Sequence, residues 1–372
     1  MKFNRDCKSF LEGFACDVMT SENLEDCSNC RFYEPYSKKL LLIKLGALGD
    51  VIRTTPILPA LKKKYGSNIH TTWLVNEGEG KDLLKYNPHI DKILEYTPEI
   101  PLRLKHEKFD ILINLDIDAK ATLIFNEVKA EEKYGYYFHE DGHPSCFNKK
   151  AEYYFNRVFS NHVNKANKKT YQEMMFEIAE LPYNKEPIEI HNFDEKYLEK
   201  FKNENNIQEG DKLICINLGA GGRWPSKAWH KDNILELIGK LKDTNYKILL
   251  RAGHNETWLQ SEIIKAVSKR GIDNVFRNRN ALEISIAQNV ALLSICDKVI
   301  TGDTLVLHIA TALKKKTLAL FFCTPPQEIE TYDLVTKLNS PLLEKYFYTD
   351  KYEENLVKSI SADEVLKWIN TS

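Results

Sequence analysis

The sequence alternates between two kinds of segment, and this alternation occurs twice along the chain. Short apolar runs, each long enough for a buried strand, are separated by segments with helical periodicity, first from Lys39 onward and again from Lys212. Such alternation is typical of βαβ units, in which helices cover a parallel sheet. A chain of 372 residues is long enough for two domains of this kind. We therefore predict an α/β fold with two parallel sheets.

The predicted elements follow from these patterns. Strands are expected at 40–44, 72–75, 92–96 and 110–115 in the first sheet, and at 213–217, 246–251, 274–276, 298–301 and 317–322 in the second. Helices are expected at 56–65, 80–86, 171–181, 233–242, 256–269, 284–293, 304–313 and 361–370. Residues 139–168 show no strong period, and 183–187 are interpreted as a linker. The chain then divides into a segment at 1–38, a first domain at 39–185 and a second domain at 186–372.

Charge and hydropathy exclude several classes of protein. The formal net charge is -1, so the chain has no overall field that would hold a polyanion, and nucleic-acid binding is not expected. A run of 18 apolar residues is absent, which argues against a membrane-spanning helix. The amino terminus lacks a charged segment followed by an apolar one, which argues against a signal peptide. We expect a cytoplasmic protein and leave peripheral association with an inner membrane open.

The loop after the first predicted strand is the first candidate for function. Gly46 and Gly49 lie at the carboxyl edge of the sheet, where open α/β folds bind ligands. Asp50 follows at the start of a helix. Taken alone, Asp50 is explained as a helix N-cap, because a carboxylate there accepts backbone N–H groups.

The second half repeats this arrangement with different chemistry. Residues 217–230 form a glycine-rich loop that carries Lys227, which suits a diphosphate, with Arg223 as a competing cation. A later strand ends before Asp303 and Thr304, at a helix start that can bind phosphate. His308 lies one turn further on the same helix face. A capped helix with a core histidine is the alternative explanation.

The first 36 residues carry a different signal. Four cysteines are spaced C-x8-C-x10-C-x2-C, at Cys7, Cys16, Cys27 and Cys30. The segment is too short to build a hydrophobic core of its own. Four thiolates predict a closed, structural metal site, with zinc as the default and iron as an alternative. The alternative without metal is four surface thiols in a flexible arm.

Several of these segments resemble glycosyltransferase family 9, the ADP-heptose heptosyltransferases. The stretch from Lys44 to Leu61 is similar to the family's first loop, Gly-Asp-Val-(Ile/Leu)-x-Thr-x-Pro-x-Leu. Residues 217–230 resemble its Lys-x-Trp-Pro element, although His230 replaces the usual proline. Residues 251–256 look like its Gly-x-x-Glu turn, and 301–313 are similar to Asp-Thr-Gly-x-x-His-x-Ala-x-Ala with Leu305 in place of the glycine.

The resemblance implies a GT-B fold of two Rossmann-like domains, with the extension at 1–38 as an addition to the family pattern. The second domain would bind the nucleotide-sugar donor through Lys227, Glu256, Asp303, Thr304 and His308. The first domain would present the acceptor and Asp50. Iron-binding cysteine fingers in the related autotransporter heptosyltransferases keep iron open for the amino-terminal segment.

The expected function is inverting transfer of a sugar, a heptose by resemblance, to a hydroxyl of a bacterial surface glycan or lipopolysaccharide core. A lipid-linked or protein acceptor stays open. Asp50 would act as the general base, and charge on the departing diphosphate would be stabilised by Lys227 and the helix start at Thr304. Because the Asp116-Ile-Asp118 run lies at a strand end of the first domain, we expect no catalytic metal.

Two other functions remain open at this stage. A nucleotide-sugar epimerase of the same architecture would form product without an acceptor. A non-catalytic sugar-nucleotide-binding protein would use the cysteine segment as a docking surface, and Leu305, by narrowing the donor site, would favour it.

Overall fold

The computed structural model of the chain describes residues 1–11, 13–278 and 284–372, which form two units. The first holds Met1–Ala47, Pro56–Asn161 and Glu173–Glu186, and the second holds Leu48–Thr55, His162–Gln172 and Pro187–Ser372. Two short pieces from the first half of the sequence, Leu48–Thr55 and His162–Gln172, therefore group with the second unit. Among the described residues, no helix is long and apolar enough to cross a membrane.

The first unit contains a six-stranded sheet in the order β3-β2-β1-β4-β5-β6. Its strands are β1 (Lys38–Ile43), β2 (Ile69–Val75), β3 (Lys92–Glu95), β4 (Lys108–Asn114), β5 (Lys129–Phe138) and β6 (Pro144–Cys146). All pairs are parallel except β5 with β6, which form an antiparallel hairpin. The apolar run at 40–43 is fully buried in β1, as expected for a strand covered on both faces.

Helices complete the first half of the chain. They are α1 (Asp17–Ser21), α2 (Leu48–Ile52), α3 (Ile57–Tyr65), α4 (Glu79–Leu84), α5 (Ile100–Leu104), α6 (Ala119–Glu127), α7 (Glu152–Phe159), α8 (Asn161–Ala166) and α9 (Tyr171–Ile178), with short 3-10 turns at Cys27–Asn29 and Lys149–Ala151. The core beneath α6 contains Leu41, Leu112 and Phe125. Residues 139–168, which show no strong period in the sequence, contain β6, α7 and α8.

The second unit contains a parallel sheet in the order β12-β11-β10-β7-β8-β9. Its strands are β7 (Lys212–Asn217), β8 (Tyr246–Arg251), β9 (Val275–Arg277), β10 (Lys298–Gly302), β11 (Lys316–Phe321) and β12 (Val335–Asn339). Its helices are α10 (Glu195–Glu204), α11 (Lys231–Leu241), α12 (Thr257–Lys269), α13 (Ile286–Ser294), α14 (Leu305–Ala312), α15 (Glu354–Val357) and α16 (Ala362–Thr371), with 3-10 turns at Pro225–Lys227, His254–Glu256 and Pro326–Glu328.

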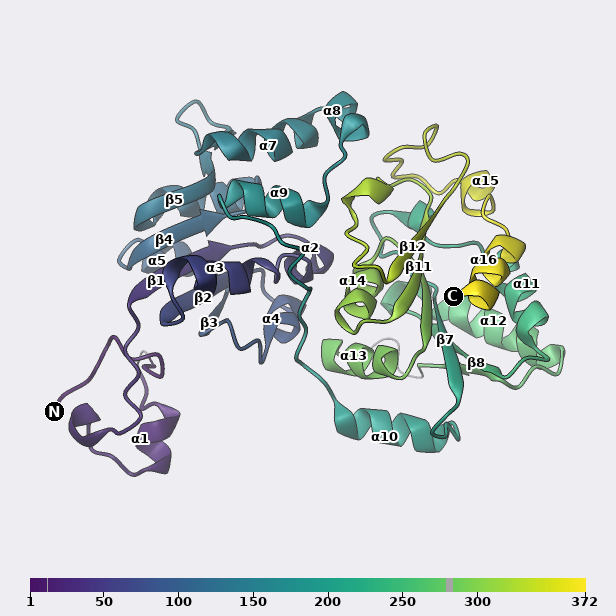
Figure 1. The fold of residues 1–372 in the computed structure, drawn as a ribbon, viewed down its shortest axis with the longest axis horizontal. Helices are drawn as coiled ribbons and strands as arrows, with labels where there is room; N and C mark the ends of the chain where they lie inside the picture. The colour runs from purple at the N-terminus through teal and green to yellow at the C-terminus, as the bar shows by residue number, and fades with distance from the viewer. Residues whose placement is uncertain (12, 279–283) are drawn as a thin grey trace. The chain divides into compact units, whose positions relative to one another are not determined.

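Helices cover both faces of this second sheet (Figure 1): α11, α12 and α16 lie on one face, and α13 and α14 on the other. Apolar residues of the first group pack with the strands in one large core, including Leu237, Ile263 and Val365. Ser361 and Glu364 form a capping box that opens α16. The fold prediction of two parallel-sheet α/β domains is confirmed.

Candidate active site

Asp50 and Arg53 form the first pair of the candidate site, and both belong to the second unit. Asp50 lies inside α2 rather than at the residue before it. Its Oδ1 accepts hydrogen bonds from Arg53 Nε at 3.0 Å and Arg53 Nη2 at 2.7 Å. Two charge-assisted bonds to one oxygen fix the carboxylate more firmly than one bond would.

Arg53 is itself held from two sides. Its guanidinium carbon lies 3.7 Å from the centre of the Tyr171 ring, and Nη2 lies 4.0 Å from Glu328 Oε2. Burial acts to lower the pKa of Arg53, but the negative charges of Asp50 and Glu328 outweigh it and hold the pKa above its ordinary value. The guanidinium therefore stays charged at all physiological pH.

His308 lies on α14 beside α2. A Cβ atom at Gly49 would come within 3.2 Å of His308 Cδ2, so a residue without a side chain lets the two helices approach. His308 is 5% exposed. Burial, followed by the charge of Arg53, lowers its pKa to about 3, although Asp303 and Asp50 act in the opposite direction. The imidazole is therefore neutral at neutral pH.

Lys227 contacts the loop that precedes α14. Its Nζ donates to Asp303 Oδ2 at 3.0 Å and to the Asp303 carbonyl oxygen at 3.1 Å. Burial acts to raise the pKa of Asp303, but the charges of Lys227 and Arg53 hold it well below its usual range. A Cβ at Gly302 would lie 2.2 Å from the Lys227 carbonyl oxygen, so glycine is required where the end of β10 meets the turn that carries Lys227.

The competing cation, Arg223, is in a different situation. It is exposed, and its guanidinium lies 5.3 Å from the centre of the Trp224 ring. His230, which stands where the family has proline, accepts a bond from Asp232 N at 3.1 Å and thereby caps α11. Of the two candidate cations, Lys227 is the one that reaches Asp303 at the start of α14.

Thr304 is the N-cap residue of α14, yet its hydroxyl bonds elsewhere. Thr304 Oγ1 lies 3.1 Å from Thr301 Oγ1 and accepts from Asn217 Nδ2 at 3.3 Å. The positive end of the helix is therefore not neutralised by its own cap side chain. A helix end of this kind suits an anion such as phosphate.

Glu256 lies in a different part of the second unit, next to a cavity of about 540 Å³. Its Oε2 accepts from Gly253 N at 3.2 Å. The cavity is bordered by the glycine-rich loop at Gly221 and Gly222 and by two largely exposed aromatic side chains, Trp258 and Tyr352. Flat aromatic walls beside a carboxylate suit a nucleoside.

The structure thus gathers five of the six predicted site residues near α14, namely Asp50, Lys227, Asp303, Thr304 and His308. Glu256 borders the neighbouring cavity instead. Arg53, Tyr171 and Glu328 were not predicted from the sequence as residues of this site. Arg53 could have been found, because it follows Asp50 by three residues on a helix. The contact of Arg53 with Tyr171 joins residues far apart in the sequence and carries no local signal.

The loop that leads to α2 is fixed within the first unit by Asp116. Its carboxylate accepts from Lys44 Nζ, from Leu45 N, and from Gly46 N at 3.0 Å. Lys44 is almost fully buried, so this ion pair is shielded from water. Asp116 therefore has a structural partner in the loop that carries Gly46.

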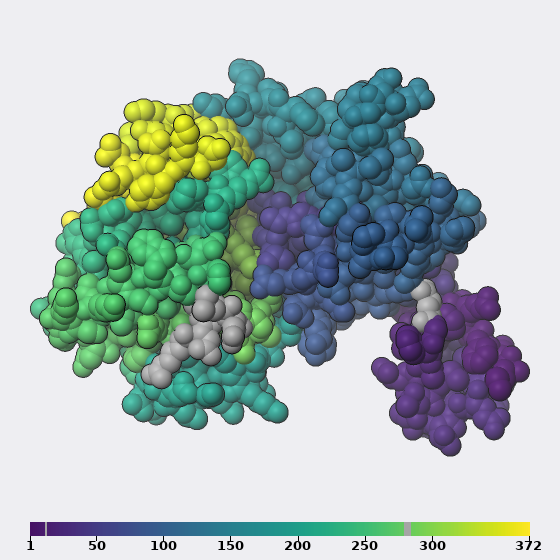
Figure 2. All heavy atoms as spheres, turned by 180° about the vertical axis from the view of Figure 1, so that it is seen from behind, coloured from purple at the N-terminus to yellow at the C-terminus, as the bar shows by residue number. Residues whose placement is uncertain are grey.

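The cysteine segment forms a small lobe, visible at the purple end of the chain in Figure 2. All four cysteines are free and line one cavity of about 490 Å³, together with aromatic residues such as Phe10 and Tyr33. In the part of the chain that the structure describes, no three of their sulfur atoms lie within 4.8 Å of one another. The thiols thus face a common space without forming a closed ligand shell.

Comparison with known proteins gives consistent results. The family model of glycosyltransferase family 9 (heptosyltransferase) matches residues 100–351. Lipopolysaccharide heptosyltransferase 1 of Campylobacter coli is 22% identical over 309 residues, covering 77% of this chain and 84% of the relative.

Two solved structures share the fold. A glycosyltransferase family 9 protein from Veillonella parvula has a TM-score of 0.68 at 19% identity, covering 91% of this chain and 97% of its own. ADP-heptose lipopolysaccharide heptosyltransferase II of E. coli has a TM-score of 0.66 at 18% identity, covering 90% and 98%. The GT-B architecture expected from the sequence is confirmed by these neighbours. Because the family model spans more than half of the chain, the protein belongs to glycosyltransferase family 9, the heptosyltransferase family, and is a glycosyltransferase.

Proposed function

We propose that this enzyme transfers a heptose from an ADP-heptose-type donor to a hydroxyl of a lipopolysaccharide or lipooligosaccharide core, with inversion at the anomeric carbon. The names of its relatives support the sugar and the acceptor. The observation that carries the proposal is the carboxylate of Asp50, held by Arg53 in the same charged cluster as Lys227 and Asp303.

Asp50 is the proposed general base. An acceptor hydroxyl is a weak nucleophile at neutral pH, so a carboxylate must take its proton as the oxygen attacks the anomeric carbon. Arg53 donates two hydrogen bonds to Asp50 Oδ1, which orients the carboxylate. The stacking of Arg53 on Tyr171 keeps this arrangement in place.

The leaving diphosphate is proposed to bind between Lys227 and the start of α14. Negative charge grows on the diphosphate as the glycosidic bond breaks, and preformed positive groups stabilise it most effectively. Asp303 holds Lys227 at the loop before the helix, where Lys227 can share its donors with a phosphate oxygen. The neutral imidazole of His308 adds no competing cation.

The nucleoside of the donor is proposed to occupy the cavity beside Glu256. Trp258 or Tyr352 would stack on the base, and Glu256 would accept from the ribose hydroxyl groups. Leu305, the first residue of α14, is proposed to influence which donor fits.

The test is turnover with ADP-heptose and a truncated lipooligosaccharide acceptor. The proposal predicts ADP release only when the acceptor is present, with proton NMR showing the anomeric configuration inverted in the product. A changed sugar configuration without acceptor would indicate an epimerase. Donor binding without any turnover would indicate a binding protein.

We also propose that Cys7, Cys16, Cys27 and Cys30 bind one structural zinc or iron ion. None of the described residues in 1–11 and 13–36 is buried, so this segment has no hydrophobic core to hold it. Four thiols facing one cavity supply the donors that such an ion prefers. Zinc–sulfur bonds of about 2.3 Å would draw the sulfur atoms closer together.

A further inference from the structure

The hairpin formed by β5 and β6 brings two histidines and an aspartate together at its tip. The turn runs from His139 to His143, and His139 N donates to the carbonyl oxygen of His143 at 2.8 Å. Gly142 has φ +88, a conformation that lets the chain reverse within five residues. The two histidines are therefore fixed opposite each other by backbone geometry.

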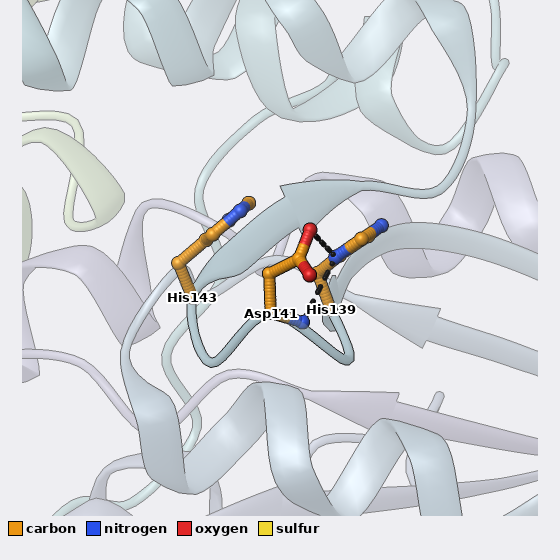
Figure 3. A group of neighbouring side chains, drawn as sticks. All are labelled: His139, Asp141 and His143. Atoms are coloured by element: carbon orange, nitrogen blue, oxygen red, sulfur yellow. Dashed lines mark hydrogen bonds and ion pairs between the residues drawn. The ribbon is translucent and has the colours of Figure 1, made fainter.

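Their side chains converge on one carboxylate. One ligand atom from each of His139, Asp141 and His143 lies within 4.8 Å of the other two, and this is the only such group of three in the described residues. The two imidazole rings are nearly parallel, at 6°, with centres 5.2 Å apart. Figure 3 shows the carboxylate of Asp141 between them.

The hydrogen bonds suggest where a cation belongs. His139 Nδ1 accepts a hydrogen bond from Asp141 N at 3.2 Å, and a bound metal ion would take this lone pair instead. The same nitrogen lies 3.1 Å from Asp141 Oδ2. A metal ion bound to both atoms would lie about 2.0–2.2 Å from the nitrogen and from the carboxylate oxygen, which fits their separation.

His143 is oriented in the way that is common for metal ligands. Its Nδ1 lies 3.0 Å from the carbonyl oxygen of Pro144. A proton on Nδ1 satisfies this carbonyl and leaves the lone pair of Nε2 available. A carbonyl oxygen that accepts from the other ring nitrogen fixes the tautomer and raises the basicity of the ligand nitrogen.

We propose that the tip of this hairpin binds one divalent first-row transition metal ion through His139, Asp141 and His143. Two imidazole nitrogens and one carboxylate oxygen suit zinc, nickel or copper. Because all three ligands come from one five-residue turn at the protein surface, water would fill the remaining coordination positions. The ion would join the two ends of the turn and stabilise the hairpin, and it requires none of the residues proposed for sugar transfer.

The test is calorimetric titration of the full-length, untagged protein with nickel chloride, since nickel favours imidazole over thiolate ligands. The variants are His139→Ala, His143→Ala and Asp141→Asn. Removing a residue that only orients a metal ligand weakens metal binding about 10- to 100-fold. Removing a ligand itself should therefore weaken nickel binding at least about 10-fold. Without metal, Asp141→Asn and His143→Ala should have the melting temperature of the wild type, because both residues are exposed.

His191→Ala is the matched control. His191 Nε2 lies 3.7 Å from Glu189 Oε2, which gives a histidine–carboxylate pair without a third ligand in the described chain. The control should bind nickel as the wild type does. Equal affinity in the wild type and in a His139→Ala/His143→Ala double variant would overturn the proposal. Loss of nickel binding in Cys27→Ser instead would also overturn it.

Discussion

His308 should make the stability of this protein depend on pH in the mildly acidic range. Its pKa is lowered from 6.5 to about 3, by burial first and by Arg53 second. The unfolded chain therefore takes up a proton at His308 below about pH 6.5, whereas the folded protein does not until about pH 3. Stability from this residue is complete above pH 6.5 and is lost progressively as the pH falls.

The size of the effect follows from the two pKa values. At pH 5, the histidine of the unfolded chain lies about 1.5 pH units below its pKa of about 6.5, and each unit corresponds to about 1.36 kcal/mol. The wild type should therefore lose about 2 kcal/mol of unfolding free energy between pH 7.5 and pH 5 through His308 alone. Asp303 should not add to this difference between pH 7.5 and pH 5. Because its pKa is also lowered, its contribution to the unfolding free energy changes only below its ordinary pKa of 3.8.

The assay is urea unfolding of the wild type and of His308→Gln at pH 7.5 and pH 5. The variant will have a lower stability at both pH values, but the difference between them should shrink by about 2 kcal/mol. Other groups titrate in both proteins and cancel in the comparison. The control His162→Gln removes an exposed histidine and should leave the difference unchanged. An unchanged pH dependence in His308→Gln would refute the buried, neutral state of this imidazole.

Three further predictions concern the donor site, the base and the cysteine segment. Arg53→Lys keeps the positive charge but loses one of the two hydrogen bonds to Asp50. A charged hydrogen bond contributes about 1.5–3 kcal/mol, so kcat should fall about 10- to 150-fold. An unchanged kcat would show that orientation by Arg53 is unnecessary. Lys227→Ala should weaken ADP binding in calorimetry by about 1.5–3 kcal/mol, whereas Arg223→Ala should not, and the reverse pattern would move the phosphate contact to Arg223. Elemental analysis should find about one zinc or iron ion per chain. The variant Cys27→Ser should release the ion and make residues 1–36 sensitive to protease, while the two sheet units stay folded. A metal-free protein whose amino terminus resists protease would contradict this metal site.

Much of the fold could be predicted because buried parallel strands are continuous apolar runs. The predicted strand at 246–251 coincides with β8, and β1, β4 and β11 differ from prediction by one or two residues at each end. Strands β5, β6 and β12 were missed. β5 has charged residues in its first half and aromatic residues in its second half, without a strand period. β6 has three residues, and β12 contains polar residues at the edge of its sheet.

The candidate site was predictable only where loops follow strands. The segments that follow strands carry Asp50, Lys227 and Asp303. In parallel sheets these segments lie at the carboxyl edge, where ligands bind, so the topology indicated that the three residues lie near a ligand. The neighbours of these residues were not predictable. Arg53 packs on Tyr171 and approaches Glu328, and both partners come from segments that show no motif. The sequence also gave no sign that Leu48–Thr55, which carries Asp50, groups with the second unit.

The most direct test of the account is the turnover of Asp50→Asn with saturating ADP-heptose. Asparagine keeps the size of the side chain and an oxygen that can accept from Arg53, so the melting temperature and donor affinity should change little. It cannot take a proton from the acceptor, so kcat should fall by about 10² to 10⁴, the contribution typical of a general base. A variant that folds, binds donor and turns over within about threefold of the wild type would show that Asp50 is not the base.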